Sequence, residues 1–554
     1  MNSLSNISHG KLIFILIIFS FFTLMFGNGI ISLTHPDEVF YIQTAKEMLS
    51  HHSWLTPILF DHPQFEKPIL SYLLFALAIK VFGDTPFVSR FWPAFFGMMG
   101  VIVVYWISWM LFRKKRLSLL AGIILSSSFI YMALSRAVLT DMIFSTWIAL
   151  SIGFFYYAYI NQYHRSRGIV LFWFFSAMAV LTKGLLGLLF PLATVGIYLV
   201  YKKDIKFFVS RGMLWGLALF FVIALPWHVL MYIKYGHSFI DEYFWNVHIR
   251  RLLVAEHPKL DNWYFYLVLM FAGMLPWGIY LFHTIRRVCL IIKQGTSDKD
   301  KLFFLLSWIV AVYIFTQPAH SKLASYILPL FYPIAIFVAF YFDYALDAKE
   351  RIIKTGAMLV GFILIIMVIG SEVYALNYIP IVSNIRAYIL LAFAGVFFIT
   401  IWYLRQKELY FFLVLSNVFM SLCLLTALFL SKPYLEPWVS CKSICERFKD
   451  IVKGEGGVLL VSKFYVRGVR YYTGEDVAVI DINGKGFFSP HPIPFLNTDQ
   501  KLLDFLKDRR EVYAIVKEGN LEDLRRILKG RPYVIKELGG EGGKYILQIR
   551  NMNI

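Results

Sequence analysis

The stretch THPDEVFYIQTAKEMLSHHSWLTPILFDHPQFEKP, residues 34–68, follows directly on the first apolar run of the chain and decides how the rest is interpreted. It places the acid pair Asp37–Glu38 and the pair Glu66–Lys67 beside hydrophobic segments. A charge costs roughly 2.5–3.5 kcal/mol at the centre of a bilayer helix, so a loop this polar must lie at the water interface. Paired charges beside a membrane suggest a reaction on a lipid-borne substrate rather than a structural turn.

The composition is that of a polytopic membrane protein. Of the 554 residues, 58% are hydrophobic and 18% aromatic, whereas soluble domains are about 45–50% apolar. The formal charge of +19 does not indicate nucleic-acid binding, because no basic helix alternates with exposed aromatic residues. The basic residues instead cluster in short connections: RKKR at 113–116, HRSR at 164–167, YKK at 201–203 and IRR at 285–287. Such clusters mark the cytoplasmic side of a membrane protein.

Apolar runs of spanning length recur over the first 430 residues. Taking about 20 residues as the length of a span, we expect about 13 crossings. They lie near 11–33, 91–112, 118–134, 142–160, 169–182, 184–201, 213–232, 263–283, 302–316, 326–345, 355–373, 386–404 and 409–430. The first run lacks a small-residue cleavage site, so it is interpreted as a retained helix and not as a signal peptide.

One further apolar segment, residues 69–82, is short for a span at roughly 14 residues. Counting it as a crossing would put the basic RKKR segment on the same side as the acidic first loop. We therefore expect this segment to lie along the outer interface, with residues 34–68, 135–141, 234–262 and 317–325 together outside. With the N-terminus inside, an odd number of crossings then predicts that the C-terminal segment lies outside as well.

From about Ser431 the hydrophobic runs shrink to strand length: GVLLVSKF, DVAVI, EVYAIVK, PYVIKEL and KYILQI. Charged helical segments near 442–453, 499–508 and 521–528 separate them, which predicts a small α/β domain. The expected organisation is a transmembrane catalytic domain at 1–430, with a first outer loop at 34–90, and a soluble α/β domain at 431–554.

The four cysteines include no CxxC pair, so a zinc ribbon or thioredoxin site is not expected. Cys441 and Cys445 lie four residues apart and form either a disulfide or two free thiols on one helix.

Two acidic positions are candidate catalytic residues. Asp37, with Glu38 beside it, lies a few residues past the first span and can act as a general base or stabilise a cationic transition state. Asp141 ends the outer segment SRAVLTD immediately before the next span. The alternative for both positions is ordinary capping of the helix that follows.

The candidate phosphate ligands are cations in outer loops. Lys67 precedes a proline, and Lys183 stands before Gly184 in the segment LTKG. The segment WNVHIRRLLVAEHPKLDNWYFY holds Arg251, and QPAHSKLASYILP holds Lys322 and Tyr326. Arginine forks suit phosphate, while surface ion pairs, helix-dipole compensation and interfacial anchoring are the structural alternatives.

These segments resemble one family in order along the chain. The first loop resembles that of the lipid A 4-amino-4-deoxy-L-arabinose transferases, whose pattern is DE-x-RY-x-x-x-A-x-x-M…W-x-x-P…F-E-K-P-P. SRAVLTDM, LTKG, HIRRLL and SKLASYILP resemble the motifs that follow, over about the first 330 residues. Phe40 replaces the arginine of the pattern and Ile69 its last proline. The family is similar to protein O-mannosyltransferases and other GT-C transferases.

The resemblance implies a GT-C fold and a set of roles. Asp37, Glu38 and Asp141 are the implied catalytic acids. The implied ligands of the donor phosphate are Lys67, Arg251, Tyr326, Lys183 and Lys322. Glu66 and His248 match residues that bind zinc in a relative, and His491 is the only histidine after His320. Zinc is therefore an expected cofactor without a convincing third ligand.

The implied reaction moves a sugar from a polyprenyl phosphate to lipid A or another envelope acceptor on the periplasmic face of the bacterial inner membrane. The transition state is oxocarbenium-like, and the leaving phosphate accumulates negative charge. No nucleotide is expected, since the chain has no P-loop or dinucleotide fingerprint. Protein O-glycosylation and lipid-linked glycan transport remain the alternatives, although no internal repeat typical of transporters is visible.

Overall fold

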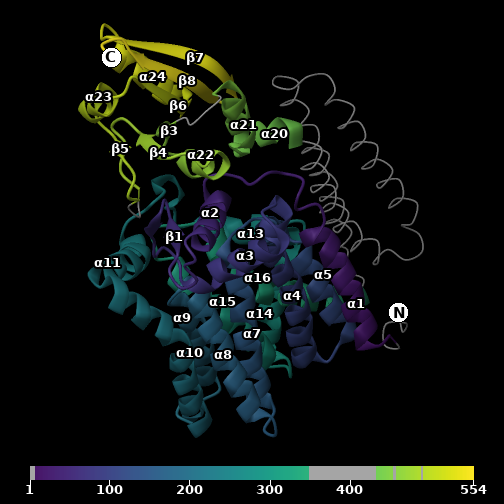
Figure 1. Ribbon diagram of the computed structural model, residues 1–554. Coiled ribbons are helices and arrows are strands. Elements are labelled where there is room, and N and C mark those ends of the chain that lie inside the picture. Colours follow the sequence, from purple (N-terminus) through teal and green to yellow (C-terminus); the bar gives the residue numbers. More distant parts are fainter. Residues whose placement is uncertain (1–6, 349–431, 453–456, 488–490) are drawn as a thin grey trace, which may run out of the picture. The chain divides into compact units, whose positions relative to one another are not determined.

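The computed structural model describes residues 7–348, 432–452, 457–487 and 491–554, which form two compact units (Figure 1). We call them the helical unit and the sheet unit. The helical unit comprises Met1–Asn28, Lys67–Ser71 and Arg90–Leu430. The sheet unit comprises Gly29–Glu66, Tyr72–Ser89 and Ser431–Ile554. The first outer loop thus groups with the C-terminal segment rather than with the apolar helices.

The helical unit is built from α-helices joined by short connections. Its principal helices are α1 (His9–Ser20), α4 (Pro86–Phe112), α5 (Lys115–Ser126), α6 (Phe129–Ser135), α7 (Thr140–Ile160), α8 (Arg165–Lys183), α9 (Leu186–Tyr201), α10 (Arg211–Tyr235), α13 (Phe265–Gly273), α14 (Leu281–Gln294), α15 (Lys299–Thr316) and α16 (Phe331–Ala348). Short pieces complete it: η2 (Phe21–Met25), η3 (Ile205–Phe207), α11 (His237–Phe239), η4 (Ile240–Arg250), α12 (Arg251–Leu253), η5 (Pro258–Leu260), η6 (Trp277–Tyr280) and η7 (Ala324–Leu330).

Several of these helices are long and apolar enough to cross a membrane. Within the described residues there are five such helices, or up to seven if each of two bent pairs is one span. The bent pairs are Lys115–Ser126 with Phe129–Ser135, at 62°, and Phe265–Gly273 with Trp277–Gln294, at 111°. The run expected near 263–283 is therefore broken, and the break falls where the chain reads Met-Leu-Pro-Trp, because a proline cannot continue the helical hydrogen bonds. The runs expected at 355–373, 386–404 and 409–430 lie outside the described residues.

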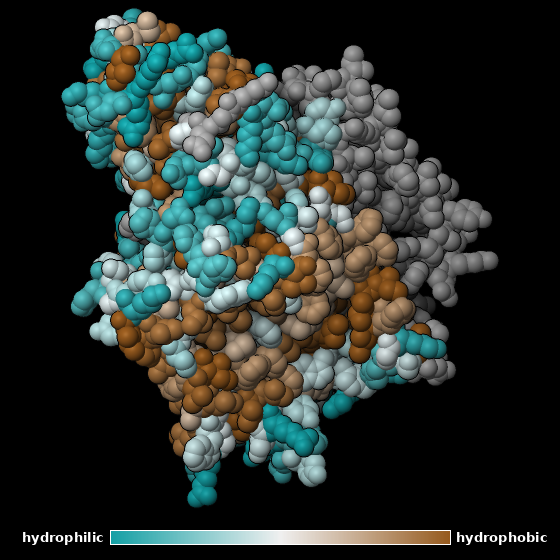
Figure 2. All heavy atoms as spheres, viewed as in Figure 1, coloured by the Kyte–Doolittle hydropathy of each residue, from teal (hydrophilic) through white to brown (hydrophobic). Residues whose placement is uncertain are grey.

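Between its charged ends, which carry the exposed Arg211 and Lys234, the surface of α10 is mostly apolar. Trp215, Val222 and Ile233 are 77%, 71% and 74% exposed. Figure 2 shows hydrophobic side chains gathered over the helices of this unit. A water-soluble protein rarely exposes so continuous an apolar surface, so lipid is the solvent that fits it.

Arg136, near the start of the motif SRAVLTD, also supports the end of the first helix. Arg136 donates hydrogen bonds to the carbonyl oxygens of Phe22, Thr23 and Phe26 at 3.1, 2.9 and 2.9 Å, where the first helix ends in a π turn. Terminal carbonyls of a helix have no partner within the helix, and a cation is favourable at that end. Arg136 thus anchors the end of the first helix.

The sheet unit contains a six-stranded sheet in the order β5-β4-β3-β6-β8-β7. Its strands are β3 (Leu459–Ser462), β4 (Val477–Ile480), β5 (Phe495–Leu496), β6 (Glu511–Lys517), β7 (Tyr533–Glu541) and β8 (Lys544–Asn551). Strands β3 to β6 pair in parallel and β7 and β8 pair antiparallel. This confirms the expected C-terminal α/β segment.

Helices cover both faces of this sheet. α23 (Asp499–Lys507) and α24 (Glu518–Leu528) share one core with side chains such as Leu460 and Ala514. The alternate side chains, such as Val461, point to the other face, where α21 (Lys442–Ile451) and α22 (Val466–Thr473) pack. Two covered faces explain why β3 and β4 are buried at every position. The short helix α20 (Lys432–Val439) precedes them.

The first outer loop forms α2 (Asp37–Ser50), the small hairpin β1 (Ile58–Leu59) and β2 (His62–Pro63), and α3 (Ile69–Phe82). Arg470 of α22 joins this loop to the C-terminal segment through Asp61 at 2.6 Å and Glu47 at 3.9 Å. Cys441 and Cys445 are free and buried, which decides between the two alternatives in favour of free thiols. Whether α3 lies along the membrane surface stays a prediction.

Candidate active site

A buried ion pair lies where two apolar helices of the helical unit end. Asp141 stands in the first turn of α7, and Lys183 is the last residue of α8. The Lys183 ammonium contacts the Asp141 carboxylate, and their side chains are only 9% and 7% exposed. The same ammonium lies 4.7 Å from the centre of the Tyr326 ring. Leu139, not Asp141, occupies the N-cap position of α7, so the acid is held for its charge.

His248 packs against the turn between α8 and α9, which directly follows Lys183. Its Nδ1 donates to the Tyr243 carbonyl at 2.7 Å, which leaves Nε2 as an acceptor for the Leu185 N–H at 3.4 Å. Gly184 has a φ of +99°, and a Cβ there would lie 2.6 Å from the His248 Nε2. Glycine is thus required twice, for the backbone conformation and for the close approach of the imidazole.

Two cations act on His248. Burial is the main cause that lowers the pKa of His248 to about 4, and the charges of Lys67 and Arg251 lower this pKa further. The imidazole is therefore neutral near pH 7, beside an ammonium and a guanidinium. Lys67 is 7% exposed, so the alternative of a surface ion pair is wrong for this residue. The Arg251 Nη2 lies 3.3 Å from Glu256 Oε2.

Backbone hydrogen bonds join Arg251 and Leu252 to the outer segment 317–325. Ser321 N–H donates to the Arg251 carbonyl at 3.0 Å, and His320 N–H donates to the Leu252 carbonyl at 3.1 Å. Lys322 is 4% exposed and pairs with Asp261 at 2.6 Å. Lys322 thus has a structural partner, Asp261, which no motif of the sequence singled out.

The helical unit therefore brings together six of the selected residues: Lys67, Asp141, Lys183, His248, Arg251 and Tyr326. They come from four separate segments of the chain and from the loop before α16. Lys322 lies in that same loop but serves the pair with Asp261.

Asp37 and Glu38 belong to the sheet unit and differ from each other. Asp37 is the first residue of α2 and is exposed. Glu38 is 4% exposed, and its Oε2 accepts hydrogen bonds from the backbone and the hydroxyl of Thr34, both at 2.9 Å. Glu38 thus ties the start of α2 to Thr34, while the N-cap residue Pro36 has no side-chain cap. Asp37 is therefore the more exposed of the two acids.

Glu66 is also in the sheet unit, close enough to His491 to influence it electrostatically. His491 Nε2 accepts a hydrogen bond from the Arg467 guanidinium at 3.0 Å. Burial and Arg467 lower the pKa of His491 to about 3. Sequence reasoning had noted His491 only as an isolated histidine and had not selected Arg467.

The residues expected to bind zinc do not assemble into a ligand set within either unit. No group of three or more His, Cys, Asp or Glu side chains suited to a metal is present among the described residues. A structural or catalytic zinc needs three or four such ligands.

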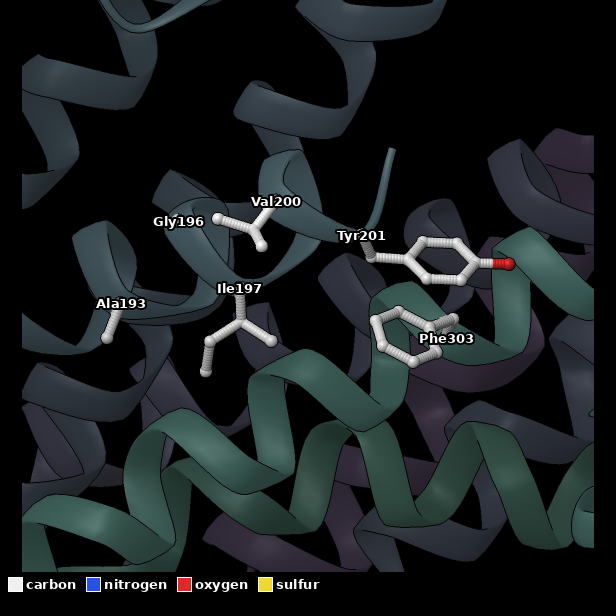
Figure 3. A pocket seen from close by; sticks show the side chains of 6 residues that line it. All are labelled: Ala193, Gly196, Ile197, Val200, Tyr201 and Phe303. Atoms are coloured by element: carbon white, nitrogen blue, oxygen red, sulfur yellow. The ribbon is translucent and has the colours of Figure 1, made fainter. Parts of the chain in front are cut away.

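An apolar groove of about 570 Å³ lies at the other end of α9 from Lys183 (Figure 3). It is lined by Ala193, Gly196, Ile197, Val200 and Tyr201 of α9 and by Phe303 of α15. The rings of Tyr201 and Phe303 stack at 3.7 Å. The groove offers no charged group and is separate from the polar cluster.

Residues 11–240 match the profile of the dolichyl-phosphate-mannose-protein mannosyltransferases. Over 350 residues the chain is 30% identical to the undecaprenyl phosphate-alpha-4-amino-4-deoxy-L-arabinose arabinosyl transferases of Yersinia pestis and Yersinia pseudotuberculosis. These alignments cover 61% of this chain and 61% of each relative. The chain thus matches about three fifths of the length of these relatives.

Solved structures extend the likeness to nearly the whole chain. ArnT from Cupriavidus metallidurans, in complex with undecaprenyl phosphate, has a TM-score of 0.78 at 17% identity and covers 97% of both chains. The archaeal oligosaccharyltransferase AglB from Archaeoglobus fulgidus has a TM-score of 0.50 at 12% identity, covering 92% of this chain and 69% of AglB. The GT-C fold, the multi-pass membrane architecture and the resemblance to the aminoarabinose transferases are confirmed.

Proposed function

We propose that this chain, a relative of the undecaprenyl-phosphate aminoarabinose transferases, is a membrane glycosyltransferase that moves a sugar from a polyprenyl phosphate to lipid A or lipopolysaccharide. One observation carries the proposal. Lys67 and Arg251 come from distant segments, and the charges of both act on the buried, neutral His248. His248 accepts a hydrogen bond from Leu185, two residues after Lys183, which pairs with Asp141. Two cations at the ends of apolar helices suit the phosphate of a lipid, because the lipid chain stays in the membrane while the phosphate reaches the polar loops.

The reaction follows from these residues. The bond between the sugar C1 and the phosphate oxygen breaks, and its electron pair leaves with the phosphate. Lys67 and Arg251 stabilise the charge that develops on the leaving group. An acceptor hydroxyl then bonds to C1 and gives its proton to Asp37, whose exposed carboxylate acts as general base. Asp141, kept next to the Lys183 ammonium, stabilises positive charge on the sugar ring.

The periplasmic face of the inner membrane is the location that we propose for the site. The basic clusters at 113–116 and 164–167 lie around the starts of α5 and α8, away from the helix ends that hold Asp141 and Lys183, and the cluster at 285–287 lies within α14. Basic clusters are typically cytoplasmic, which supports a site on the outer side.

A protein O-glycosyltransferase is the second candidate, favoured by the match of residues 11–240 to the protein mannosyltransferase profile. The two candidates share the donor chemistry and differ in the acceptor. Zinc stays a prediction for either, and metal analysis of the purified protein, with Glu66→Ala as the comparison, tests it.

The decisive experiment is sugar transfer by the purified protein in lipid nanodiscs. Undecaprenyl-phosphate aminoarabinose is supplied with lipid A or with a serine-rich peptide, and products are read by mass spectrometry. Transfer to lipid A that Asp37→Asn abolishes supports the proposal, since asparagine caps a helix about as well as aspartate but cannot take a proton. Transfer to the peptide alone favours the second candidate. A wild-type protein that transfers to neither acceptor, with that donor and with undecaprenyl-phosphate hexoses, contradicts both.

A further inference from the structure

Arg467 stacks on the residue in which this chain departs from the pattern of the first loop. The pattern has an arginine where this chain has Phe40. The guanidinium carbon of Arg467, from α22, lies 4.5 Å from the centre of the Phe40 ring. Both residues belong to the sheet unit. A guanidinium thus lies over position 40, supplied by a different segment of the chain.

Arg467 forms no ion pair with a carboxylate among the described residues, although Glu66 acts electrostatically on its neighbour His491. One terminal nitrogen donates to His491, a neutral imidazole, at 3.0 Å. Its Nε is buried and has no hydrogen-bond acceptor. The guanidinium is only partly exposed, and no carboxylate of the described chain forms an ion pair with it. The aromatic ring stabilises the cation above it but does not neutralise its charge.

Arg470, one turn further along α22, shows what a structural arginine looks like in the same place. It pairs with Asp61 at 2.6 Å, with Asp476 at 2.7 Å and with Glu47 at 3.9 Å. All of its charge is used inside the sheet unit. Within residues 7–348, 432–452, 457–487 and 491–554, no carboxylate neutralises Arg467, whereas three carboxylates neutralise Arg470.

We propose that Arg467 binds a phosphate oxyanion of a lipid substrate, as a binding residue for the reaction proposed above. A guanidinium binds such an anion through its terminal nitrogens, and the stack on Phe40 holds those of the partly exposed Arg467 side chain in place, while protein covers its Nε. The phosphate comes either from the polyprenyl donor or from a phosphorylated lipid acceptor. The inference rests on the proposed function, because that function supplies both phosphate lipids.

The test measures binding by the full-length protein in nanodiscs. The probes are undecaprenyl phosphate, lipid A with its phosphates, and dephosphorylated lipid A. Arg467→Gln removes the charge, Arg467→Lys keeps the charge without the fork, and the double variant Arg467→Gln/Phe40→Arg returns a guanidinium from the loop. Arg525→Gln is the matched control, since Arg525 is an exposed arginine of the same unit.

Arg467→Gln is expected to lower the affinity for one of the two phosphate lipids roughly 10- to 100-fold, at an unchanged melting temperature. Weaker binding of undecaprenyl phosphate would assign Arg467 to the donor phosphate. Weaker binding of lipid A, with unchanged binding of its dephosphorylated form, would assign Arg467 to the acceptor phosphate. Arg467→Lys should bind between the two, and the double variant should recover part of the affinity. Arg525→Gln should bind as wild type does.

Equal affinity of wild type and Arg467→Gln for both phosphate lipids would overturn the inference and leave the proposed function standing. Affinity that falls only together with the melting temperature, and that the double variant does not recover, would make Arg467 structural and overturn it too. A wild-type protein that binds neither phosphate lipid removes the proposed function and this inference together.

Discussion

The helical unit and the sheet unit differ in how their charged side chains are paired. In the helical unit, Lys183 pairs with Asp141, Lys322 with Asp261 and Arg251 with Glu256. In the sheet unit, Arg470 is paired three times while Arg467 has no carboxylate partner among the described residues. Burying a charge is expensive unless a partner compensates for it. A partly buried charge that has no carboxylate partner among the described residues, such as that of Arg467, is therefore a candidate for binding a charged ligand.

The largest expected effect comes from breaking the buried pair of the helical unit. Asp141→Asn leaves the Lys183 ammonium buried without its carboxylate, which should cost about 3–5 kcal/mol of stability and abolish transfer. The double variant Asp141→Leu/Lys183→Met removes both charges and should regain most of the stability but none of the activity. Thermal unfolding and the transfer assay measure the two effects separately. Activity in the double variant would show that the pair is only structural.

The second prediction concerns the cations that converge on His248. Lys67→Ala and Arg251→Ala should each weaken undecaprenyl-phosphate binding by about 1.5–3 kcal/mol, roughly 10- to 150-fold. Arg251→Lys should recover only part, because an ammonium lacks the two-pronged contact. Lys259→Ala, an exposed cation of the same loop, is the control. Unchanged donor affinity in both variants would place the phosphate elsewhere, with Lys183 and Lys322 as the next pair.

The third prediction uses two histidines of the sheet unit. Burial is the main cause that lowers the pKa of both His35 and His491 to about 3. The unfolded chain binds these protons near pH 6.5, so their contribution to stability is full above that pH and falls toward pH 3. Between pH 6.5 and 4.5 each should lose roughly 1–3 kcal/mol.

Hydrogen exchange of the strands β3 and β4 at the two pH values measures this loss. His35→Asn should reduce the pH dependence, and the exposed control His62→Gln should keep it. A slope that is the same in wild type and His35→Asn would refute the assignment to this histidine.

The smallest effect separates Asp37 from Glu38. Glu38→Ala removes two hydrogen bonds at the start of α2 and should cost about 0.5–2 kcal/mol of stability. Asp37→Asn, at an exposed position, should change stability by less than about 0.5 kcal/mol. Melting temperatures of the two variants, measured beside the transfer assay, test whether one acid holds the helix while the other serves the chemistry. Equal destabilisation would contradict that division.

Much of the fold could be predicted from the sequence, because long apolar runs admit few interpretations. The runs at 91–112, 142–160 and 213–232 became α4, α7 and α10 with boundaries shifted by a few residues. Helix α22 was missed, since eight residues with two arginines carry too little apolar pattern to stand out. That short helix holds Arg467 and Arg470, which explains why both were overlooked.

The candidate site was predictable only in part. Charged residues in outer loops beside spans are unusual enough to select Lys67, Asp141 and Lys183 without a structure. The partners of Lys322 and Arg467 were not selectable, because Asp261 and His491 lie 61 and 24 residues away from them along the chain and carry no local signal.

The sequence by itself determined that this is a multi-pass membrane protein with polar loops and a C-terminal α/β segment, because hydrophobic length and alternation are local properties. Only the tertiary structure decided which charges neutralise each other and which do not. It paired Lys183 with Asp141, made Glu38 a structural acid and left Asp37 exposed. The physical reason is that electrostatic energy depends on distance and burial in the folded chain, and neither is written in the order of the residues.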